Sequence, residues 1–308
     1  MKWIDLNRAK IKVYGKKSKL ALKGISEEHK AFLHNLLTND IVNLPEKHFN
    51  YNLRLNGKGY PIQDFFVYNY GDFFLLDTEE DSKKIIDEFD KLKLSMQVFF
   101  EDLTPNYKHI FIFGENADEF IKKAFNIEQL EPFKFVFQEN VTVARNFLRN
   151  GEDGYDIFGE IDDVLNFLEN KNKITQEEFE SIRIENCIPK IHKELKEGYL
   201  PLETPITEFA ISFTKGCYIG QEVIARVYYR GNPPRTLAKF SFNENLHEGE
   251  KIVDNDKKIG EITSISPKKN IALGYILKAK LRENTFKTES GKDVKLLGEC
   301  KINAVNSK

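Results

Sequence analysis

The sequence predicts an α+β fold of antiparallel sheets covered by helices, followed by a small C-terminal β-barrel. Three observations support this prediction. Strand patterns follow one another across turn residues, which is typical of hairpins. Helical patterns occur between these hairpins but do not separate every strand from the next, as a doubly wound parallel sheet requires. The last part of the chain shows only short strand patterns and turns.

The first predicted elements are a helix and a meander of strands. Apolar residues recur at helical spacing across residues 25–39, behind Ser26 as a suitable N-cap. Residues 49–76 then alternate between apolar and polar or run apolar, as strands do. Their first turn contains Asn56-Gly57, a dipeptide typical of tight hairpins, and their second is Asn69-Tyr70-Gly71-Asp72. We therefore expect a helix packed on an antiparallel sheet.

Further helices and strands follow through the middle of the chain. Apolar residues share one face of a helical pattern at 79–94. Thr175 and Glu178 form a capping-box pattern that begins another helix, at 175–184. We also expect strands at 98–103, 109–113 and 141–147, and helices at 117–125 and 161–168.

A boundary is indicated by Gly231-Asn232-Pro233-Pro234, because paired prolines cannot continue a helix or a central strand. Beyond it, residues 236–308 show short strand patterns divided by turns. Closing such strands into a barrel removes exposed edges. At 308 residues the chain is long enough for two or three domains.

The overall charge does not indicate a polyanionic partner. The chain has 46 Lys and Arg against 48 Asp and Glu, a formal charge of -2. The basic stretch at residues 10–23 could face phosphates, but solvated lysines on an exposed strand are the simpler interpretation. No apolar run approaches the ~18 residues that a membrane span needs, and the N-terminus has no signal core. We therefore expect a cytoplasmic protein without a membrane partner.

The cysteine count bears on the redox compartment. Cys187, Cys217 and Cys300 are an odd number in a long chain. This count fits a reducing compartment better than a disulfide framework, so we expect any disulfide to be transient. Cys187 and Cys300 are expected to be small buried hydrophobic side chains.

Several kinds of site lack their sequence signals. The six histidines include no pair at metal-ligand spacing, and three scattered cysteines cannot supply the four thiolates that an iron-sulfur cluster usually takes. No metal site is therefore predicted. The chain has no Gly-x-Ser-x-Gly elbow and no glycine-rich phosphate loop. These absences argue against hydrolases, ATPases and dehydrogenases.

Cys217 is the remaining candidate for chemistry. Lys215 lies two residues before it, Gly216 and Gly220 lie on either side, and a helical pattern begins at Glu222. Glycines allow a close backbone approach or a sharp turn into a helix. A thiol at a helix N-terminus beside an ammonium is favoured as thiolate and is reactive. The alternative is one more small buried side chain, as free cysteines usually are.

One segment resembles the signature of the YgfZ-like proteins, a branch of the family of the glycine-cleavage T protein: Lys215-Gly216-Cys217-Tyr218-Ile219-Gly220-Gln221-Glu222. Other segments resemble the same family, from about residue 20 to residue 276. They are a first helix at 32–40, a hairpin at 57–67, an Arg-x-Glu-x-Gly-x-Pro segment at 183–189, and barrel motifs at 260–264 and 272–275.

The resemblance implies three parts arranged as a ring around a tetrahydrofolate site. A first ferredoxin-like α+β domain would comprise residues 1–48 and about 140–232, and a second α+β domain would comprise about 49–139. The C-terminal β-barrel would span residues 235–308. Tetrahydrofolate or a reduced derivative of it is the implied cofactor.

The resemblance also implies roles for single residues. Glu152 matches the carboxylate that holds the pterin, since a carboxylate accepts two parallel hydrogen bonds, and Arg183 matches an arginine that faces the folate. Asp64, Tyr155 and Asn39 are further candidate folate contacts. The candidate reactive residues are Cys217 and Lys215, within the motif positions Gly216, Tyr218, Gly220, Gln221 and Glu222.

Departures from the T proteins bear on the activity. Gln63-Asp64 stands where the aminomethyltransferases carry an Asp-Asp pair, and an amide can act neither as a base nor as an anion. Transfer of an aminomethyl group is thereby put in doubt. Cys217, which the aminomethyltransferases lack, points to the YgfZ-like branch. Cys187 replaces a glycine of the family pattern, and the sequence offers no physical reason for that substitution.

The leading hypothesis is that the protein binds tetrahydrofolate and supports assembly or repair of iron-sulfur clusters in client enzymes, including tRNA-modifying ones, through Cys217. It would then be no conventional enzyme, with folate and client iron-sulfur proteins as partners. The alternative is a folate-dependent aminomethyltransferase or another one-carbon transferase, for which only Asp64 of the carboxylate pair remains. A second alternative is a tRNA-binding module that uses residues 10–23, although direct tRNA binding is not expected.

Overall fold

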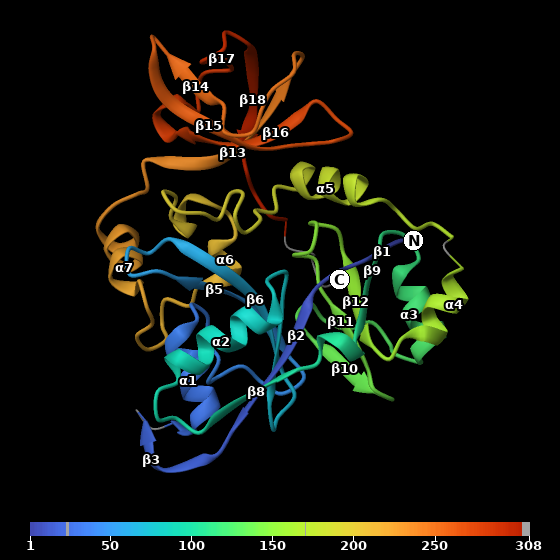
Figure 1. The fold of residues 1–308 in the computed structure, drawn as a ribbon. Helices are drawn as coiled ribbons and strands as arrows, with labels where there is room; N and C mark the ends of the chain where they lie inside the picture. Colours follow the sequence, from blue (N-terminus) through green and yellow to red (C-terminus); the bar gives the residue numbers. More distant parts are fainter. Residues whose placement is uncertain (23–24, 170, 304–308) are drawn as a thin grey trace.

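The computed structural model describes residues 1–22, 25–169 and 171–303, with only the backbone described at 18–22. It contains two five-stranded antiparallel sheets and a closed six-stranded barrel. Figure 1 shows the barrel at one end of the molecule, with the two sheets side by side below it. The expected combination of antiparallel sheets, helices and a C-terminal barrel is confirmed.

The first sheet, here called the β2 sheet, has the strand order β5-β6-β7-β2-β8. Its strands are β5 (Phe49–Leu55), β6 (Pro61–Asn69), β7 (Phe74–Thr78), β2 (Ala9–Gly15) and β8 (Val98–Asp102). Helices α1 (Glu28–Leu36) and α2 (Ser82–Leu92) pack on one face of it and bury a cluster that includes Phe32, Phe65 and Phe89. The apolar faces of the two helices and of the strands pack against one another here, as the spacing of their apolar residues allows.

The second sheet, here called the β9 sheet, has the strand order β1-β9-β12-β11-β10. Its strands are β1 (Lys2–Asp5), β9 (Lys108–Phe113), β12 (Gly154–Gly159), β11 (Val141–Arg145) and β10 (Phe135–Gln138). Helices α3 (Ala117–Phe125) and α4 (Asp162–Leu168) cover one face. Helix α5 (Gln176–Glu185) packs through Phe179 against Phe111 and Phe113 on the other face.

The two sheets share a core of aromatic side chains. Tyr51, Phe66 and Tyr68 from the β2 sheet cluster with Phe135 and Phe158 from the β9 sheet. The rings of Tyr68 and Phe158 meet edge to face, with their centroids 5.3 Å apart. Edge-to-face packing of this kind adds to the free energy gained from burying the rings. The shared core therefore fixes one sheet against the other.

The barrel has the closed strand order β13-β16-β15-β14-β17-β18. Its strands are β13 (Arg235–Phe242), β14 (Lys251–Asp254), β15 (Lys257–Ile265), β16 (Ile271–Leu277), β17 (Thr285–Thr288) and β18 (Asp293–Glu299). Phe240, Ile262 and Phe286 are among the side chains that fill it. Closure leaves no unpaired sheet edge, which is the physical reason why short strands suffice here.

The remaining elements are short. Strands β3 (Lys17–Leu22) and β4 (Ile25–Glu27) form a hairpin that leads into α1. Between α5 and the barrel lie α6 (Thr207–Ala210) and α7 (Gln221–Arg230). Short 3-10 helices occur at η1 (Thr104–Asn106), η2 (Pro201–Glu203) and η3 (Lys278–Lys280).

Local predictions fare unevenly. The helix expected at 117–125 and the capping box of Thr175 and Glu178 are confirmed. The helix expected at 25–39 begins only at Glu28, because residues 25–27 pair as β4, and Ser26 donates to Glu27 instead of capping the helix. Those expectations for the start of the helix were wrong.

The hairpin expected at Asn56-Gly57 is confirmed, because β5 and β6 pair as antiparallel neighbours, but its turn is the longer loop of residues 56–60. The side chain of Asn56 accepts hydrogen bonds from the backbone N–H groups of Lys58 and Tyr60, which closes the loop over itself. Gly59, with φ +81°, supplies the left-handed residue that the loop needs.

The strands divide between the sheets differently from the expected domain segments. β1 and β2 are neighbours in sequence but belong to different sheets, and β9 and β10 join the β9 sheet although they lie within residues 49–139. The first barrel strand begins at Arg235. Among the described residues, none of the helices combines the length and the apolar character that crossing a membrane would require.

Candidate functional site

A cavity of about 700 Å³ lies where the two sheets meet α5 and the segment that follows it. Its walls come from the link between β1 and β2, from β5 and β6, from the loop between β11 and β12, from α5, and from residues 188–193. Asp64 and Arg183, two of the predicted site residues, both line it. Segments far apart in the sequence therefore form one site.

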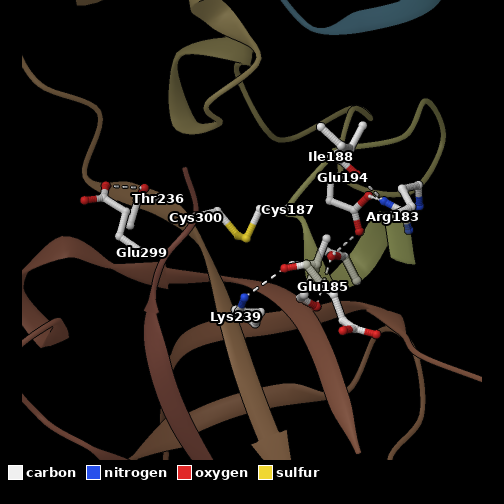
Figure 2. The surroundings of a disulfide bond; sticks show 11 residues. Arg183, Glu185, Cys187, Ile188, Glu194, Thr236, Lys239, Glu299 and Cys300 are labelled. Atoms are coloured by element: carbon white, nitrogen blue, oxygen red, sulfur yellow. Dashed lines mark hydrogen bonds and ion pairs between the residues drawn. A yellow bond between two sulfur atoms is a disulfide. The ribbon is translucent and has the colours of Figure 1, made fainter. Parts of the chain in front are cut away.

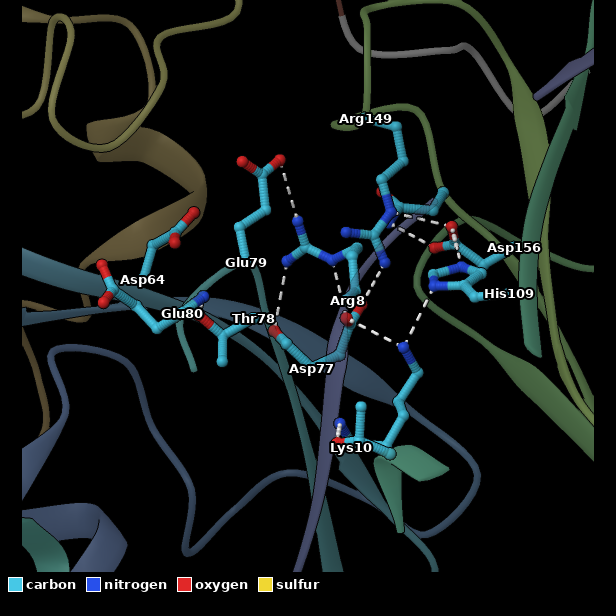
Figure 3. Close-up of polar contacts among 12 residues, drawn as sticks. Arg8, Lys10, Asp64, Asp77, Thr78, Glu79, Glu80, His109, Arg149 and Asp156 are labelled. Carbon is cyan, nitrogen blue, oxygen red and sulfur yellow. Dashed lines mark hydrogen bonds and ion pairs between the residues drawn. The ribbon is translucent and has the colours of Figure 1, made fainter. Parts of the chain in front are cut away.

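A buried charge cluster lies behind one wall of the cavity and joins the two sheets (Figure 3). Arg8 donates to Asp77 at 2.6 Å, and Lys10, which pairs across the strands with Asp77, donates to the same carboxylate at 3.2 Å. The cluster consists of Arg8, Lys10 and Asp77 from the β2 side, with His109, Arg149 and Asp156 from the β9 side.

The second half of the cluster centres on Arg149 and Asp156. Arg149 Nε donates to Asp156 Oδ1 at 2.7 Å, and Arg149 Nη2 donates to Asp77 Oδ2. His109 Nε2 lies 2.9 Å from Asp156 Oδ1, while Lys10 Nζ lies 3.0 Å from His109 Nδ1. Arg149 thus bridges one carboxylate from each sheet, Asp77 on β7 and Asp156 on β12, so the cluster holds the sheets together.

Burial and neighbouring charges together lower the pKa values of Asp77, Lys10 and His109. Burial opposes ionisation of Asp77, but the guanidinium groups of Arg149 and Arg8 hold its pKa well below the ordinary value. Burial lowers the pKa of Lys10 to about 8, against the attraction of Asp77. Burial and the nearby Lys10 ammonium lower the pKa of His109 to about 3, so its ring is neutral at physiological pH.

Two residues that line the cavity each carry a buried polar atom without a partner among the described residues. These atoms are Asp64 Oδ1 and Arg149 Nη1, both on side chains that are more than nine-tenths buried. The Tyr51 hydroxyl donates to the other oxygen of Asp64 at 2.8 Å. Burial raises the pKa of Asp64 above its ordinary value, and the Arg8 guanidinium offsets only part of this. An acceptor and a donor are therefore left open beside the same cavity.

Arg183 lines the cavity but is saturated. Its Nε and Nη2 donate to the carboxylate of Glu180 at 2.9 and 2.7 Å, and Nη2 also donates to Ser264 at 3.0 Å. Its Nη1 donates to the Ile188 carbonyl and, at 3.1 Å, to Glu194. All five N–H groups have partners within the chain, so Arg183 has none left for a ligand.

Glu194 links Arg183 to the barrel. It accepts hydrogen bonds from Thr263 at 2.7 Å and from Ser264 at 2.6 Å, both on β15. Figure 2 shows Arg183 and Glu194 pointing toward one another near the disulfide that joins the same two parts of the chain. Arg183 therefore connects the cavity wall to the barrel through hydrogen bonds.

Gln63 and Asp64 point to opposite faces of β6, as successive strand residues do. Gln63 donates to Glu88 of α2 at 3.0 Å and accepts from Arg54 at 2.7 Å, on the face covered by helices. The amide that replaces the expected carboxylate therefore lies away from the cavity. Gln63 therefore removes no anion from the cavity and does not speak against aminomethyl transfer there.

Three predicted folate contacts lie outside the residues that line this cavity. Glu152 is exposed and accepts from Asn186 at 3.3 Å. Tyr155 is buried in the β9 sheet, and its hydroxyl donates to Asp118 at 2.6 Å. Asn39 donates to the backbone carbonyls of Tyr51 and Phe209, which ties the end of α1 to neighbouring segments. The cavity itself brings together Asp64 and Arg183.

Cys217 is a free, exposed thiol, which excludes the alternative of a buried side chain. It does not lie at the start of a helix as expected, because α7 begins at Gln221 behind Gly220, leaving the cysteine outside the first turn. Gly220 has φ +84°, and a Cβ there would lie 2.6 Å from the Asn56 carbonyl oxygen, so glycine is required.

Lys215 points away from the thiol that it was expected to activate. Its ammonium donates to the carbonyls of His34 and Leu37 and, at 2.9 Å, to that of Asn39, at the C-terminal end of α1. Burial lowers its pKa to about 7. A cation is favourable beside the open carbonyls of a helix end, so Lys215 caps α1.

The other motif positions shape the same segment. Gly216 is exposed, whereas Tyr218 is buried with its ring 5.1 Å from the Lys215 ammonium. Gln221 and Glu222 occupy the first turn of α7. The motif therefore builds a fixed turn that presents the thiol.

Cys187 and Cys300 form a disulfide, contrary to the expectation of separate thiols (Figure 2). It links the end of α5 to the end of the barrel, two segments that no local pattern brings together. Cys187 has φ +60°, in the left-handed region where glycine is favoured. This conformation explains why the family pattern has glycine at the position. In this chain a cysteine adopts it and forms the disulfide with Cys300.

The basic stretch at residues 10–23 does not form one exposed surface. Lys10 is fully buried in the charge cluster, and Lys12 pairs with Glu101 at 3.0 Å. The side chains of Lys19 and Lys23 lie outside the described residues. The interpretation as solvated lysines is therefore wrong for Lys10.

Several residues of the cavity have no clear sequence signal. Arg8, Tyr51, Glu79, Arg149 and Lys190 line it, and Lys190 pairs with Glu79 at 2.9 Å. Charges in loops have no periodicity, so Arg149 could have been suspected only from its place near Glu152. In the described part of the chain, no group of three or more His, Cys, Asp or Glu side chains is arranged to hold a metal ion.

Comparison with known proteins places most of the chain in a family. Residues 16–215 match the model of the GCVT N-terminal domain. The chain belongs to this family. The crystal structure of glycine cleavage system aminomethyltransferase T from Bartonella henselae is similar to 96% of this chain and 84% of its own, with a TM-score of 0.79 and 18% identity. At that identity the likeness shows the fold.

Two kinds of named protein, aminomethyltransferases and a tRNA-modifying protein, are among the relatives in sequence. An aminomethyltransferase of Thermoanaerobacter sp. (strain X514) is 28% identical over 80% of this chain and 72% of its own length. The tRNA-modifying protein YgfZ of Blochmanniella pennsylvanica is 28% identical over 68% of this chain and 65% of its own. An uncharacterized protein of Aquifex aeolicus is 60% identical over 42% of this chain and 87% of its own. The resemblance to the YgfZ-like branch of the T-protein family is thus confirmed.

Proposed function

We propose that this protein binds a reduced folate, tetrahydrofolate in the first place, in the cavity between its sheets. In this proposal it supports assembly or repair of iron-sulfur clusters in client enzymes, including tRNA-modifying ones, through the thiol of Cys217. The observation that carries the folate part is the pair of open polar atoms, Asp64 Oδ1 and Arg149 Nη1, on the wall of one cavity.

The cavity has the features of a small-molecule site. A volume of about 700 Å³ is within the range of roughly 300–1,000 Å³ typical of ligand pockets. Tyr51, Phe66 and Phe179 contribute aromatic surface for a flat ring, and Asp64 contributes an acceptor for ring or amino N–H groups. A pterin offers both a flat face and such donors.

The thiol part of the proposal is supported by exposure and presentation. Cys217 lies in a turn fixed by the buried Tyr218 and by Gly220, and its sulfur is free. An exposed thiol can bind an iron atom or exchange with a disulfide in another protein. Both require access by a client protein, which the exposed position permits.

The thiol is tested in a deletion strain complemented with the wild type or with Cys217→Ala. We expect the variant to restore none of the activity that iron-sulfur enzymes lose under oxidative stress, while its melting temperature stays at that of the wild type because the side chain is exposed. Thr214→Ala, an exposed change in the same segment, is the matched control. Full rescue by Cys217→Ala would exclude the thiol.

Folate-dependent aminomethyl transfer is the second candidate. It is favoured by Asp64, which lies in the cavity with an open oxygen while Gln63 points elsewhere, and by the relative named aminomethyltransferase. Incubation with tetrahydrofolate and an aminomethylated carrier protein should then yield methylenetetrahydrofolate and ammonia. Asp64→Asn should abolish this yield. No product from the wild type would exclude this activity and leave the binding function in place.

A further inference from the structure

Arg149 is held rigidly by its neighbours, yet one end of its guanidinium group is open. Asp156 and Asp77 accept from Nε and Nη2 respectively. The Phe66 ring lies against the group, with its centroid 4.1 Å from the central carbon. Nη1 is buried and has no hydrogen-bond partner among the described residues. Leaving a buried donor unsatisfied is unfavourable, which a ligand acceptor would correct.

Arg149 is part of the cavity wall, whereas its counter-ions are not. Arg149 lines the cavity, while Asp77 and Asp156 are absent from the residues that line it. The cavity is lined by more cations than anions: Arg8, Arg149, Arg183, Lys190 and Lys193 against Asp64, Glu79 and Glu180. Each of these cations is paired with a carboxylate, so the donor without a partner on Arg149, and not the number of charges, is what favours a ligand with an anionic acceptor.

Arg183 provides an internal comparison. It lines the same cavity and is equally buried, but each of its five N–H groups has a partner inside the chain. Saturation is what a purely structural arginine requires. Arg149 departs from this pattern, because Nη1 has no partner among the described residues and Nη2 has one partner for its two N–H groups.

We propose that Arg149 binds a carboxylate oxygen of the ligand through Nη1 and thereby selects a carboxylate-bearing folate over an uncharged pterin. This inference rests on the proposed folate site. A guanidinium group suits the role because it stays charged and presents its donors in a fixed plane. Asp64 Oδ1, the open acceptor of the same cavity, then takes a donor N–H from another part of the ligand.

The first measurement uses the unmodified full-length protein and isothermal titration with three probes. They are tetrahydrofolate, the diamide of tetrahydrofolate in which both carboxylates are carboxamides, and a tetrahydropterin that lacks the aminobenzoylglutamate part. We expect the diamide to bind about tenfold or more weakly than tetrahydrofolate, because a hydrogen bond between two charged groups is lost. This comparison does not depend on the folding of any variant.

The second measurement repeats the titrations with Arg149→Lys and with Arg183→Lys as the matched control. Arg149→Lys keeps a positive charge between Asp77 and Asp156 but removes Nη1. We expect tetrahydrofolate and its diamide to bind this variant within about twofold of one another, while tetrahydropterin affinity is unchanged. Arg183→Lys should keep the tenfold preference, whatever its effect on stability.

The outcomes separate this inference from the proposed function. If tetrahydrofolate and its diamide bind the wild type equally, the carboxylate role of Arg149 is overturned and the folate site stands. If Arg149→Lys keeps the full preference for tetrahydrofolate, another residue recognises the carboxylate and the inference is equally overturned. If none of the three probes binds the wild type, the folate site and the inference both fail.

Discussion

The junction between the two sheets and the junction between α5 and the barrel both bury an arginine among carboxylates. At the first, Arg149 is shared by Asp77 and Asp156 and keeps an open Nη1 beside the cavity. At the second, Arg183 is saturated and the Cys187–Cys300 disulfide adds a covalent link. The second junction therefore serves stability, while the first combines stability with an unused donor for a ligand.

The difference between the junctions follows from what surrounds each arginine. Arg183 is enclosed by its own helix, by Glu194 and by the barrel strand β15, so each donor meets an oxygen. Arg149 has strands on one side and the cavity on the other. Within the described chain, its N–H groups have hydrogen-bond partners only on the strands, at Asp156 and Asp77. At Asp64 and Arg149, polar atoms without partners occur on residues that line a cavity, and this coincidence indicates where a ligand is expected.

The largest effect should come from removing the carboxylate at the centre of the sheet junction. Asp77→Ala leaves Arg8, Lys10 and Arg149 without their shared partner, and breaking a buried ion pair in this way costs about 3–5 kcal/mol. Urea unfolding of the purified variant measures the loss. A free energy of unfolding within 1 kcal/mol of the wild type, taken as roughly the typical effect of a point mutation, would contradict the assigned role of the cluster.

The same carboxylate predicts how the junction responds to acid. The pKa of Asp77 is lower in the folded protein than in the unfolded chain, so its contribution is fully present above the unfolded value of about 3.9. This contribution is lost as the pH falls through the folded pKa. Asp77→Ala should therefore unfold with a weaker dependence on acid pH than the wild type.

The second effect concerns the barrel junction. The disulfide joins residues 113 positions apart, and closing a loop of this length stabilises a fold by about 2–5 kcal/mol. A variant with both Cys187→Ala and Cys300→Ala should lose that much in urea unfolding. A reductant should lower the stability of the wild type and of Cys217→Ala but not of the double variant. Three reactive thiols in the native protein without reductant would disprove the bridge.

The smallest effect should come from Asp64, the acceptor without a partner beside the cavity, and its substitution should raise the free energy of unfolding instead of lowering it. Burial raises the folded pKa of Asp64, so its contribution to stability falls as the pH rises from the ordinary value through the folded value. Asp64→Asn removes this loss and should be more stable at pH 7, by about 1 kcal/mol. Its affinity for tetrahydrofolate should fall. A variant that is less stable and still binds would contradict an acceptor kept for a ligand.

Much of the local structure could be predicted from sequence patterns. The meander of β5, β6 and β7, the helices α3 and α5 and the barrel strands β13, β15, β16 and β18 follow from apolar periodicity and turn residues, whereas the short strands β14 and β17 do not. The start of α1 could not, because residues 25–27 pair with a strand of the same hairpin. Periodicity describes one segment at a time and does not report a competing strand partner.

The candidate site shows a similar division. The resemblance directed attention to Asp64, Arg183 and Cys217, and the structure places the first two on one cavity wall and exposes the third. In the structure Lys215 caps α1 and does not act on Cys217. Although the two residues are close in sequence, the Lys215 ammonium donates hydrogen bonds to three backbone carbonyls at the end of α1. Tyr155 and Asn39 are held by partners within the fold.

The sequence by itself determined the classes of element, the family and the presence of an unusual thiol, because these depend on residues close together in the chain. Only the tertiary structure decided that Gln63 faces away from the cavity, that Cys187 meets Cys300, and that Arg149 keeps one donor open. The physical reason is that burial, pairing and saturation depend on which distant segments surround a side chain. Charges and thiols carry no periodicity that would reveal those neighbours in advance.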